Sequence, residues 1–177
     1  MMTKVGAVTL IMTVTMVMMM MTTATKTSEE RAVEHHQLPK RHYTICSGPS
    51  NVPVRVCTKT AHSSWLGTTG TDSDISISLG GSKCHTTWQD LDNAGNDFMP
   101  NALDCFNFNT QNLGPEVTSV RIHSDMSGVG PGWELDYVKT RYKNSDQKTT
   151  CRIWWFEIWI EDTYDKERTK AGGVKCF

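Results

Sequence analysis

Residues 127–138 constrain the fold of this chain most, because a glycine-rich turn there leads directly into an alternating strand. The three glycines of the sequence Gly-Val-Gly-Pro-Gly can adopt positive φ at little cost, and Pro131 fixes one φ among them. Trp133, Leu135 and Tyr137 then fall on one face of a strand, with acidic residues between them pointing the other way. The pattern predicts a tight loop followed by a strand whose apolar face is buried.

Alternation of apolar and polar residues recurs along the chain and is clearest at Ile75, Ile77 and Leu79. The other predicted strands are residues 52–56, with Pro53 at an edge or at the strand's start, 84–91, 104–108, 117–123 and 152–160. No stretch repeats apolar residues with helical spacing over three turns. These features predict an all-β protein, an antiparallel β-sandwich of about eight strands stapled by disulfides.

Two of these strands carry predictions about individual side chains. In the strand 84–91, Trp88 and Leu91 are expected to be buried. In the strand 152–160, Trp154 and Phe156 share one face with the later isoleucines, so Trp155 lies on the opposite face. Trp155 is therefore expected either to be exposed or to meet a partner.

The first 24 residues are interpreted as a secretory signal peptide. Lys4 supplies a positive start, an uncharged run over 5–21 follows, and small residues at 22–24 suit cleavage. A membrane anchor is the alternative, since this run could nearly cross a bilayer. No second hydrophobic run occurs, so the mature protein is expected to be secreted, extracellular and without a transmembrane anchor.

Residues 25–41 are polar and charged and offer few apolar side chains for a core. They end in Lys40-Arg41, which resembles the dibasic site at which a pro-segment is cleaved. The alternative is that the pair is only a solvated part of a loop. If the site is cut, the mature domain spans residues 42–177.

All six cysteines lie after the dibasic pair, and an even number in a secreted chain favours three disulfides. They are Cys46, Cys57, Cys84, Cys105, Cys151 and Cys176. Their spacing does not suit a zinc site, and six cysteines allow about 15 pairings. Cys46 and Cys176 lie near the two ends of the mature domain, where chain termini often approach each other, so this pair is the first expectation.

Five short blocks occur in an order that resembles the PLAT (lipoxygenase homology) domain family. They are Gly70-Thr71-Asp72, Leu91-Asp92-Asn93, Asn96-Asp97-Phe98, Asp104-Cys105-Phe106, and the long block from Asp125 through Gly130-Pro131-Gly132-Trp133 to Val138. The resemblance spans roughly residues 52–160. It departs from many members after Asn-Asp-Phe, where this chain has Met99-Pro100 in place of a Glu or Arg.

The resemblance implies that calcium could bind between two loops. Asp72, Asn96 and Asp97 fall where calcium-binding members of the family place ligands, and Asp74 could add a carboxylate. The alternative is that these side chains only hydrogen-bond the backbone nearby, as Asp and Asn commonly do in loops. Asp125 either lies at the same end of the sandwich as these predicted ligands or caps its own turn.

The same loops predict a contact with a membrane or with a partner. Trp65-Leu66 precedes the Gly-Thr-Asp block and Met99 follows the Asn-Asp-Phe block, so apolar tips are expected beside the polar loop residues. Trp is favoured at membrane interfaces because its ring is apolar while its N–H can remain wet. Trp155 is a further candidate, and the alternative for Trp65 is that it folds back onto the sandwich.

The function expected from these features is a secreted, non-enzymatic PLAT binding module for a lipid or membrane surface or a protein receptor. The chain has neither a Gly-x-Ser-x-Gly nor a His-Glu-x-x-His motif, so no enzyme activity is expected. Its net charge of −1 without a basic stripe argues against a nucleic-acid partner. The alternatives are a secreted toxin or venom component processed at the dibasic site and, third, a lipid-modifying enzyme, whose catalytic domain would be missing.

Overall fold

The computed structural model describes residues 43–177 apart from 63–68, 129 and 131. The predicted signal peptide, pro-segment and dibasic pair Lys40-Arg41 therefore lie outside the described residues, as do Trp65 and Leu66. The described residues contain no helix that is long and apolar enough to cross a membrane.

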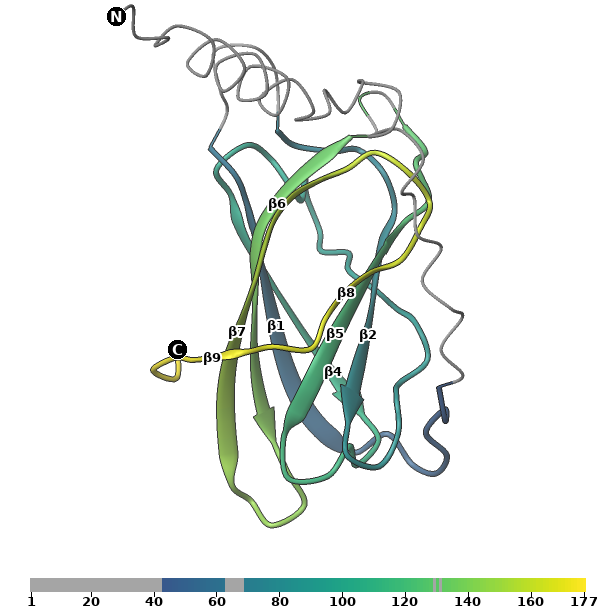
Figure 1. The fold of residues 1–177 in the computed structure, drawn as a ribbon, viewed down its shortest axis with the longest axis vertical. Coiled ribbons are helices and arrows are strands. Elements are labelled where there is room, and N and C mark those ends of the chain that lie inside the picture. Colours follow the sequence, from purple (N-terminus) through teal and green to yellow (C-terminus); the bar gives the residue numbers. More distant parts are fainter. Residues whose placement is uncertain (1–42, 63–68, 129, 131) are drawn as a thin grey trace, which may run out of the picture. The chain divides into compact units, whose positions relative to one another are not determined.

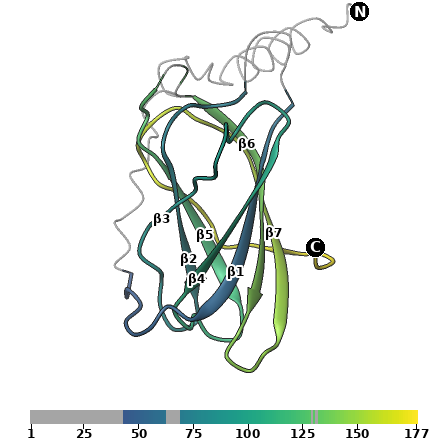
Figure 2. The ribbon, with the colours of Figure 1, turned by 180° about the vertical axis from the view of Figure 1, so that it is seen from behind.

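The described residues form strands and no helix. The strands are β1 (Val52–Thr60), β2 (Ile75–Gly81), β3 (Gln89–Asp90), β4 (Leu103–Thr110), β5 (Val117–Ser124), β6 (Trp133–Lys143), β7 (Thr149–Ile160), β8 (Lys166–Arg168) and β9 (Gly172–Gly173). They pair antiparallel into a sheet of order β4-β1-β6-β7-β9 and a sheet of order β3-β2-β5-β8, packed face to face (Figures 1 and 2). The predicted antiparallel β-sandwich is confirmed.

The core lies between the inner faces of the two sheets. Its largest fully buried side chains include Trp133 and Leu135 from β6 and Trp154 from β7, which face Ile77 and Leu79 of the other sheet. The alternation that predicted the strands also places these residues inside, because successive side chains of a strand point to opposite faces. Pro53 stands second in β1, near its start, where the sequence allowed it.

The prediction that Tyr137 shares the buried face of Trp133 and Leu135 is wrong. The pairing of β6 with β1 shifts register here: Lys59 and Thr60 are adjacent in β1 but pair with Tyr137 and Leu135, so β6 has one extra residue between them. Such a bulge adds one residue to the strand and reverses the alternation beyond it. Val138 is consequently buried, and Tyr137 turns to the outer face of the five-stranded sheet, where its ring lies 5.1 Å from that of Trp155.

The predicted strand 84–91 is mostly absent, because only Gln89–Asp90 pairs as β3. His85 forms single bridges to Ile45 and Gly80. Leu91 is buried, but Trp88 is 38% exposed, with the Arg121 guanidinium 4.7 Å from its ring centroid. The expected burial of Trp88 is therefore wrong, since without a regular strand nothing turns its ring toward the core.

Three disulfides connect the described cysteines: Cys46–Cys84, Cys57–Cys105 and Cys151–Cys176. The expected Cys46–Cys176 pair is wrong. The backbone N–H of Cys46 donates to the oxygen of His85, and the N–H of His85 donates to the oxygen of Thr44, so the start of the described chain is held beside Cys84. Cys176 instead follows β9, which pairs with Arg152 and Ile153 of β7 and so brings the tail to Cys151.

The segment after β7 contributes a strand to each sheet. β8 pairs with β5 at one edge of the four-stranded sheet, and β9 pairs with β7 at one edge of the five-stranded sheet. Arg168 of β8 also donates hydrogen bonds to the backbone oxygens of Trp155 and Phe156 at 3.1 and 3.0 Å. The C-terminal segment therefore holds one edge of both sheets.

Candidate binding surfaces

Three loops meet at one end of the sandwich, which we call the loop end: residues 69–74, 92–102 and 125–132, as far as they are described. A Cβ added to Gly70 would lie 2.5 Å from the backbone oxygen of Phe98, and one added to Gly128 would lie 2.7 Å from that of Asp72. Ser73 also donates a 2.9 Å hydrogen bond to the backbone oxygen of Ser127. The loops are thus in close contact, and glycine is needed where their backbones approach each other.

Trp133 anchors the loop end from inside the sandwich. Its indole N–H donates a 3.0 Å hydrogen bond to the hydroxyl of Thr60, and both side chains are fully buried. Its ring packs on Phe98, with 5.0 Å between the centroids. Phe98 adopts a φ of 57°, in the left-handed region, and its N–H donates a 2.9 Å hydrogen bond to the Asp104 carboxylate.

Asp104 is partly withdrawn from water at this position. Burial raises the pKa of its carboxyl, and the hydrogen bond from Phe98 only partly offsets that rise. Asp97 nearby raises the pKa further, whereas Lys59 lowers it. The carboxylate therefore joins the loop to β4 at an electrostatic cost.

Two of the four predicted calcium ligands make contacts within their own loop. Both carboxylate oxygens of Asp97 accept hydrogen bonds from Asn93, at 2.7 Å from the backbone N–H and 3.0 Å from the side-chain amide. The amide of Asn96 lies 3.0 Å from the sulfur of Met99. Asp72 and Asp74 are exposed.

Asp125 caps its own turn, one of the two roles expected for it. Its Oδ1 accepts the N–H groups of Ser127 at 2.9 Å and of Asp74 at 3.0 Å. The hydrogen bonds from Ser127 hold the pKa of this carboxyl below its ordinary value. Within residues 43–177, gaps excepted, no three His, Cys, Asp or Glu side chains are grouped to hold a metal ion. As placed, the described loop-end carboxylates are not grouped to hold a calcium ion.

Exposed apolar side chains lie on the outer face of the five-stranded sheet near the loop end. Four directly paired residues form a row across four strands, in the order Leu103 of β4, Lys59 of β1, Tyr137 of β6 and Trp155 of β7. Leu103 and Trp155 are each 51% exposed, and Trp159, four residues further along β7 toward the loop end, is 47% exposed. We call Leu103, Tyr137, Trp155 and Trp159 the apolar row.

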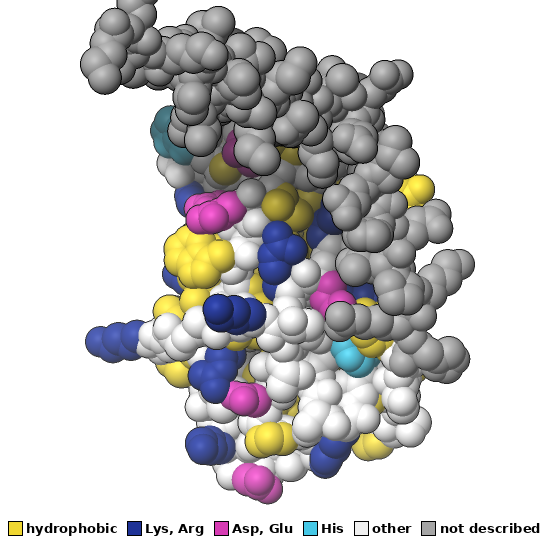
Figure 3. Space-filling view, viewed as in Figure 1, with side chains coloured by type: hydrophobic (Ala, Val, Ile, Leu, Met, Phe, Trp, Pro, Cys, Tyr) yellow, Lys and Arg dark blue, Asp and Glu magenta, His cyan; other side chains and the backbone are white. Residues whose placement is uncertain are grey.

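The apolar row combines one expected residue with others that the sequence did not single out. Trp155 was expected on this face, whereas Leu103 was not considered and Tyr137 was expected inside. Met99, the loop candidate, is 47% exposed at the loop end. Figure 3 shows one face of the molecule, on which hydrophobic side chains are interspersed with basic and acidic ones. The position of Trp159 on this face could have been inferred from the sequence, because it lies four residues after Trp155 and residues at a period of two share one face of a strand.

Comparison with protein families identifies one model, described as the PLAT/LH2 domain, that matches residues 54–169. A search of curated proteins finds no match. Among solved structures, the fold resembles that of coral 8R-lipoxygenase, which is described as activated by calcium through a C2-like domain. The TM-score is 0.56 and the identity 22%, over 65% of this chain and 16% of that one.

Two further structures extend the comparison. A calcium-dependent 11R-lipoxygenase matches with a TM-score of 0.51 and 20% identity, over 65% of this chain and 17% of its own. The alpha toxin from Clostridium absonum matches with a TM-score of 0.51 and 20% identity, over 71% of this chain and 33% of its own. At these identities the likeness establishes the fold, and this chain spans a third or less of each of these proteins.

Proposed function

Because the chain belongs to the PLAT/LH2 domain family, we propose that it acts as a non-enzymatic binding module for a lipid or membrane surface. The observation that carries this proposal is the apolar row, in which Leu103, Trp155 and Trp159 are each about half exposed on one sheet face. The family resemblance implied the same class of ligand. Secretion belongs to the proposal and is supported by the three disulfides, which persist in oxidising compartments.

The chemistry of the row suits a membrane interface. Exposed apolar side chains that lie together on one face often mark a site of interaction. Trp155 presents a ring edge-on to Tyr137, and both side chains are amphipathic, with an apolar body and a polar group that can stay wet. Lys59 lies between Leu103 and Tyr137 in the same row and can meet anionic headgroups.

The magnitude follows from the exposure of Trp155. A Trp side chain can bury up to about 250 Å², so inserting its exposed half would remove about 125 Å² from water and contribute about 3 kcal/mol at about 25 cal/mol per Å². That is an upper bound, equivalent to about a hundredfold in affinity. Truncating Trp155 should therefore weaken vesicle binding by about tenfold, and by no more than about a hundredfold.

The test is sedimentation of the secreted protein with phosphatidylcholine vesicles, with and without phosphatidylserine, in calcium and in chelator. Trp155→Ala should lose binding, and Trp88→Ala is the matched control, because Trp88 is also exposed but lies beside the other sheet, next to β3. Trp65→Ala tests the loop that lies outside the described residues. Undiminished binding by Trp155→Ala, or an equal loss in Trp88→Ala, would contradict the proposal.

A further inference from the structure

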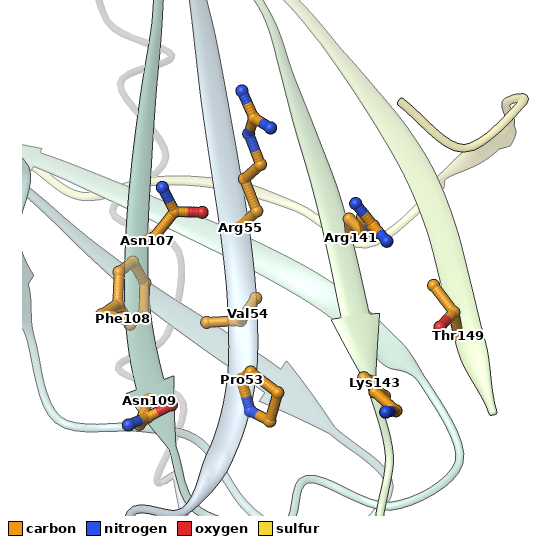
Figure 4. A pocket seen from close by; sticks show the side chains of 9 residues that line it. All are labelled: Pro53, Val54, Arg55, Asn107, Phe108, Asn109, Arg141, Lys143 and Thr149. Atoms are coloured by element: carbon orange, nitrogen blue, oxygen red, sulfur yellow. The ribbon is translucent and has the colours of Figure 1, made fainter. Parts of the chain in front are cut away.

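A second feature lies on the outer face of the five-stranded sheet, further from the loop end than the apolar row. It is a hollow of ≈ 360 Å³ across β4, β1, β6 and the start of β7 (Figure 4). The polar side chains that line it are Arg55, Arg141, Lys143, Asn107, Asn109 and Thr149. Every one of them can donate a hydrogen bond, and three carry a positive charge.

The strand register brings these groups together. Arg55 of β1 pairs directly with Asn107 of β4 on one side and with Arg141 of β6 on the other. Lys143 pairs with Thr149 two residues further along the sheet. Directly opposed residues have Cβ atoms about 4.5–5.5 Å apart, and like charges in that position destabilise a sheet. The facing arginines are therefore a repulsive pair unless something neutralises them.

Acidic side chains do not supply that neutralisation. Elsewhere Arg121 pairs with Asp165 and Arg152 with Glu116. Within the described part of the chain, by contrast, Arg55, Arg141 and Lys143 form no ion pair with an Asp or Glu side chain.

The protein contacts of the two arginines leave much of their hydrogen-bonding capacity unused. Arg141 donates one 3.3 Å hydrogen bond to the backbone oxygen of Phe177. The Arg55 guanidinium lies 6.0 Å from the centroid of the Phe177 ring, and its Nε is buried without a hydrogen-bond partner. A buried donor of a charged group that stays unsatisfied is costly, which points to a ligand.

We infer that this hollow is a binding site for an oxyanion, a phosphate or sulfate group carried by a small ligand. The planar guanidinium matches the geometry of such groups and can donate two parallel hydrogen bonds to them. Lys143 adds a point charge, and the amides of Asn107 and Asn109 can complete the donor set. The oxyanion would neutralise the Arg55–Arg141 pair and offer an acceptor to the Nε of Arg55.

The oxyanion hollow is separate from the apolar row. Arg55 and Lys59 are four residues apart on β1, which corresponds to about 13 Å along the strand at about 3.3 Å per residue. Both lie on the same sheet face, so a phosphorylated lipid headgroup is one source of the group and a soluble phosphorylated or sulfated molecule is the other. The inference does not depend on membrane binding.

The first experiment measures thermal unfolding of the secreted protein against inorganic phosphate, inorganic sulfate and inositol hexakisphosphate, with chloride holding the ionic strength constant. The wild type should show a saturable rise in Tm. Arg141→Gln should weaken binding at least about tenfold, because a hydrogen bond to a charged group is lost. Lys170→Gln removes an exposed charge outside the hollow and should bind like the wild type.

Folding is controlled within the same experiment. Removing one charge of the repulsive pair should leave the Tm of anion-free Arg141→Gln no lower than that of the wild type, and Arg55→Gln provides an independent second variant. The absence of a saturable Tm rise in the wild type would overturn the inference. Equal anion responses in Arg141→Gln, Arg55→Gln and Lys170→Gln would do so as well, because they indicate general charge screening.

The second experiment separates the two sources of the group. Phosphatidylcholine vesicles with and without phosphatidylinositol bisphosphate are sedimented with wild type, Arg141→Gln and Trp155→Ala. Binding that requires the phosphoinositide and is lost in Arg141→Gln supports a lipid headgroup, even if Trp155→Ala binds normally and the proposed role of the apolar row fails. Anion binding in solution without such vesicle binding supports a soluble ligand. If only Trp155→Ala loses vesicle binding and anions do not raise the Tm of the wild type, the inferred oxyanion site is refuted and the proposed function stands.

Discussion

The hydrogen bond between Trp133 and Thr60 gives the sharpest test of how the loop end is held together. The indole N–H donates to the Thr60 hydroxyl at 3.0 Å, and neither side chain is exposed. Thr60→Val keeps the side-chain shape but leaves the indole N–H without an acceptor. Trp133→Phe removes that N–H and leaves a buried hydroxyl without its donor. The double variant removes both partners at once.

The expected magnitudes follow from these structural differences. A buried polar group left unpaired costs about 1–3 kcal/mol. Thr60→Val should therefore lower the free energy of unfolding by about that amount, and Trp133→Phe by about 2–4 kcal/mol, because the smaller ring also leaves space against Phe98. The double variant leaves neither the indole N–H nor the hydroxyl unpaired. Its loss in free energy of unfolding should therefore be about 1–2 kcal/mol smaller than the sum of the losses in the single variants.

The assay is urea unfolding of wild type, the two single variants and the double variant, with the disulfides intact. Tyr142→Phe combined with Thr60→Val is the control, because the Tyr142 hydroxyl serves a different contact, with Leu113 and Gly114. That control pair should be additive. Additivity within about 0.5 kcal/mol for Trp133→Phe with Thr60→Val would refute the reasoning.

Three further predictions concern acid, calcium and processing. Asp104→Asn keeps an acceptor for the Phe98 N–H but removes a carboxyl whose pKa is raised, so thermal melts should show the variant at least as stable as wild type at neutral pH. That advantage should shrink as the pH falls through the folded-state pKa of Asp104, because protonation then favours the folded wild type; an advantage that grows in acid would contradict this. Calcium should leave the Tm unchanged, because the described loop-end carboxylates are not grouped to hold a metal ion, and a saturable rise would show otherwise. Intact-mass analysis of secreted protein should give residues 42–177 with all six cysteines oxidised, whereas a chain beginning near residue 25 would mean that the dibasic pair is not cut.

The fold was predictable because strand alternation is a local property of the sequence. The period of two at Ile75, Ile77 and Leu79 places these side chains inside, as expected. The orientation of Tyr137 was not predictable, because the bulge that reverses it depends on how β6 pairs with β1. The disulfide pairing likewise depends on which strands become neighbours, and that information is not local to any cysteine.

The candidate binding surfaces were predictable only in part, for the same reason. Trp155 was expected on the outer face from alternation alone. Arg55 and Arg141 are far apart in sequence and become opposed only through the register of β1 and β6. The sequence analysis found no basic stripe, but basic residues at 139, 141 and 143 share one strand face at a period of two, and this was the available signal.

The attachment of the C-terminal segment bears on how the protein avoids associating with copies of itself. A free sheet edge presents unpaired N–H and C=O groups to any other strand, and short strands or charged side chains on the edge prevent such pairing. Here β8 covers part of β5, while β9 and the Arg168 guanidinium occupy separate stretches of the β7 edge. The Cys151–Cys176 bridge tethers this segment covalently to β7. Reduction of that bridge would free the tail beyond β9 and so loosen the cover of the β7 edge, while β8 would stay paired with β5.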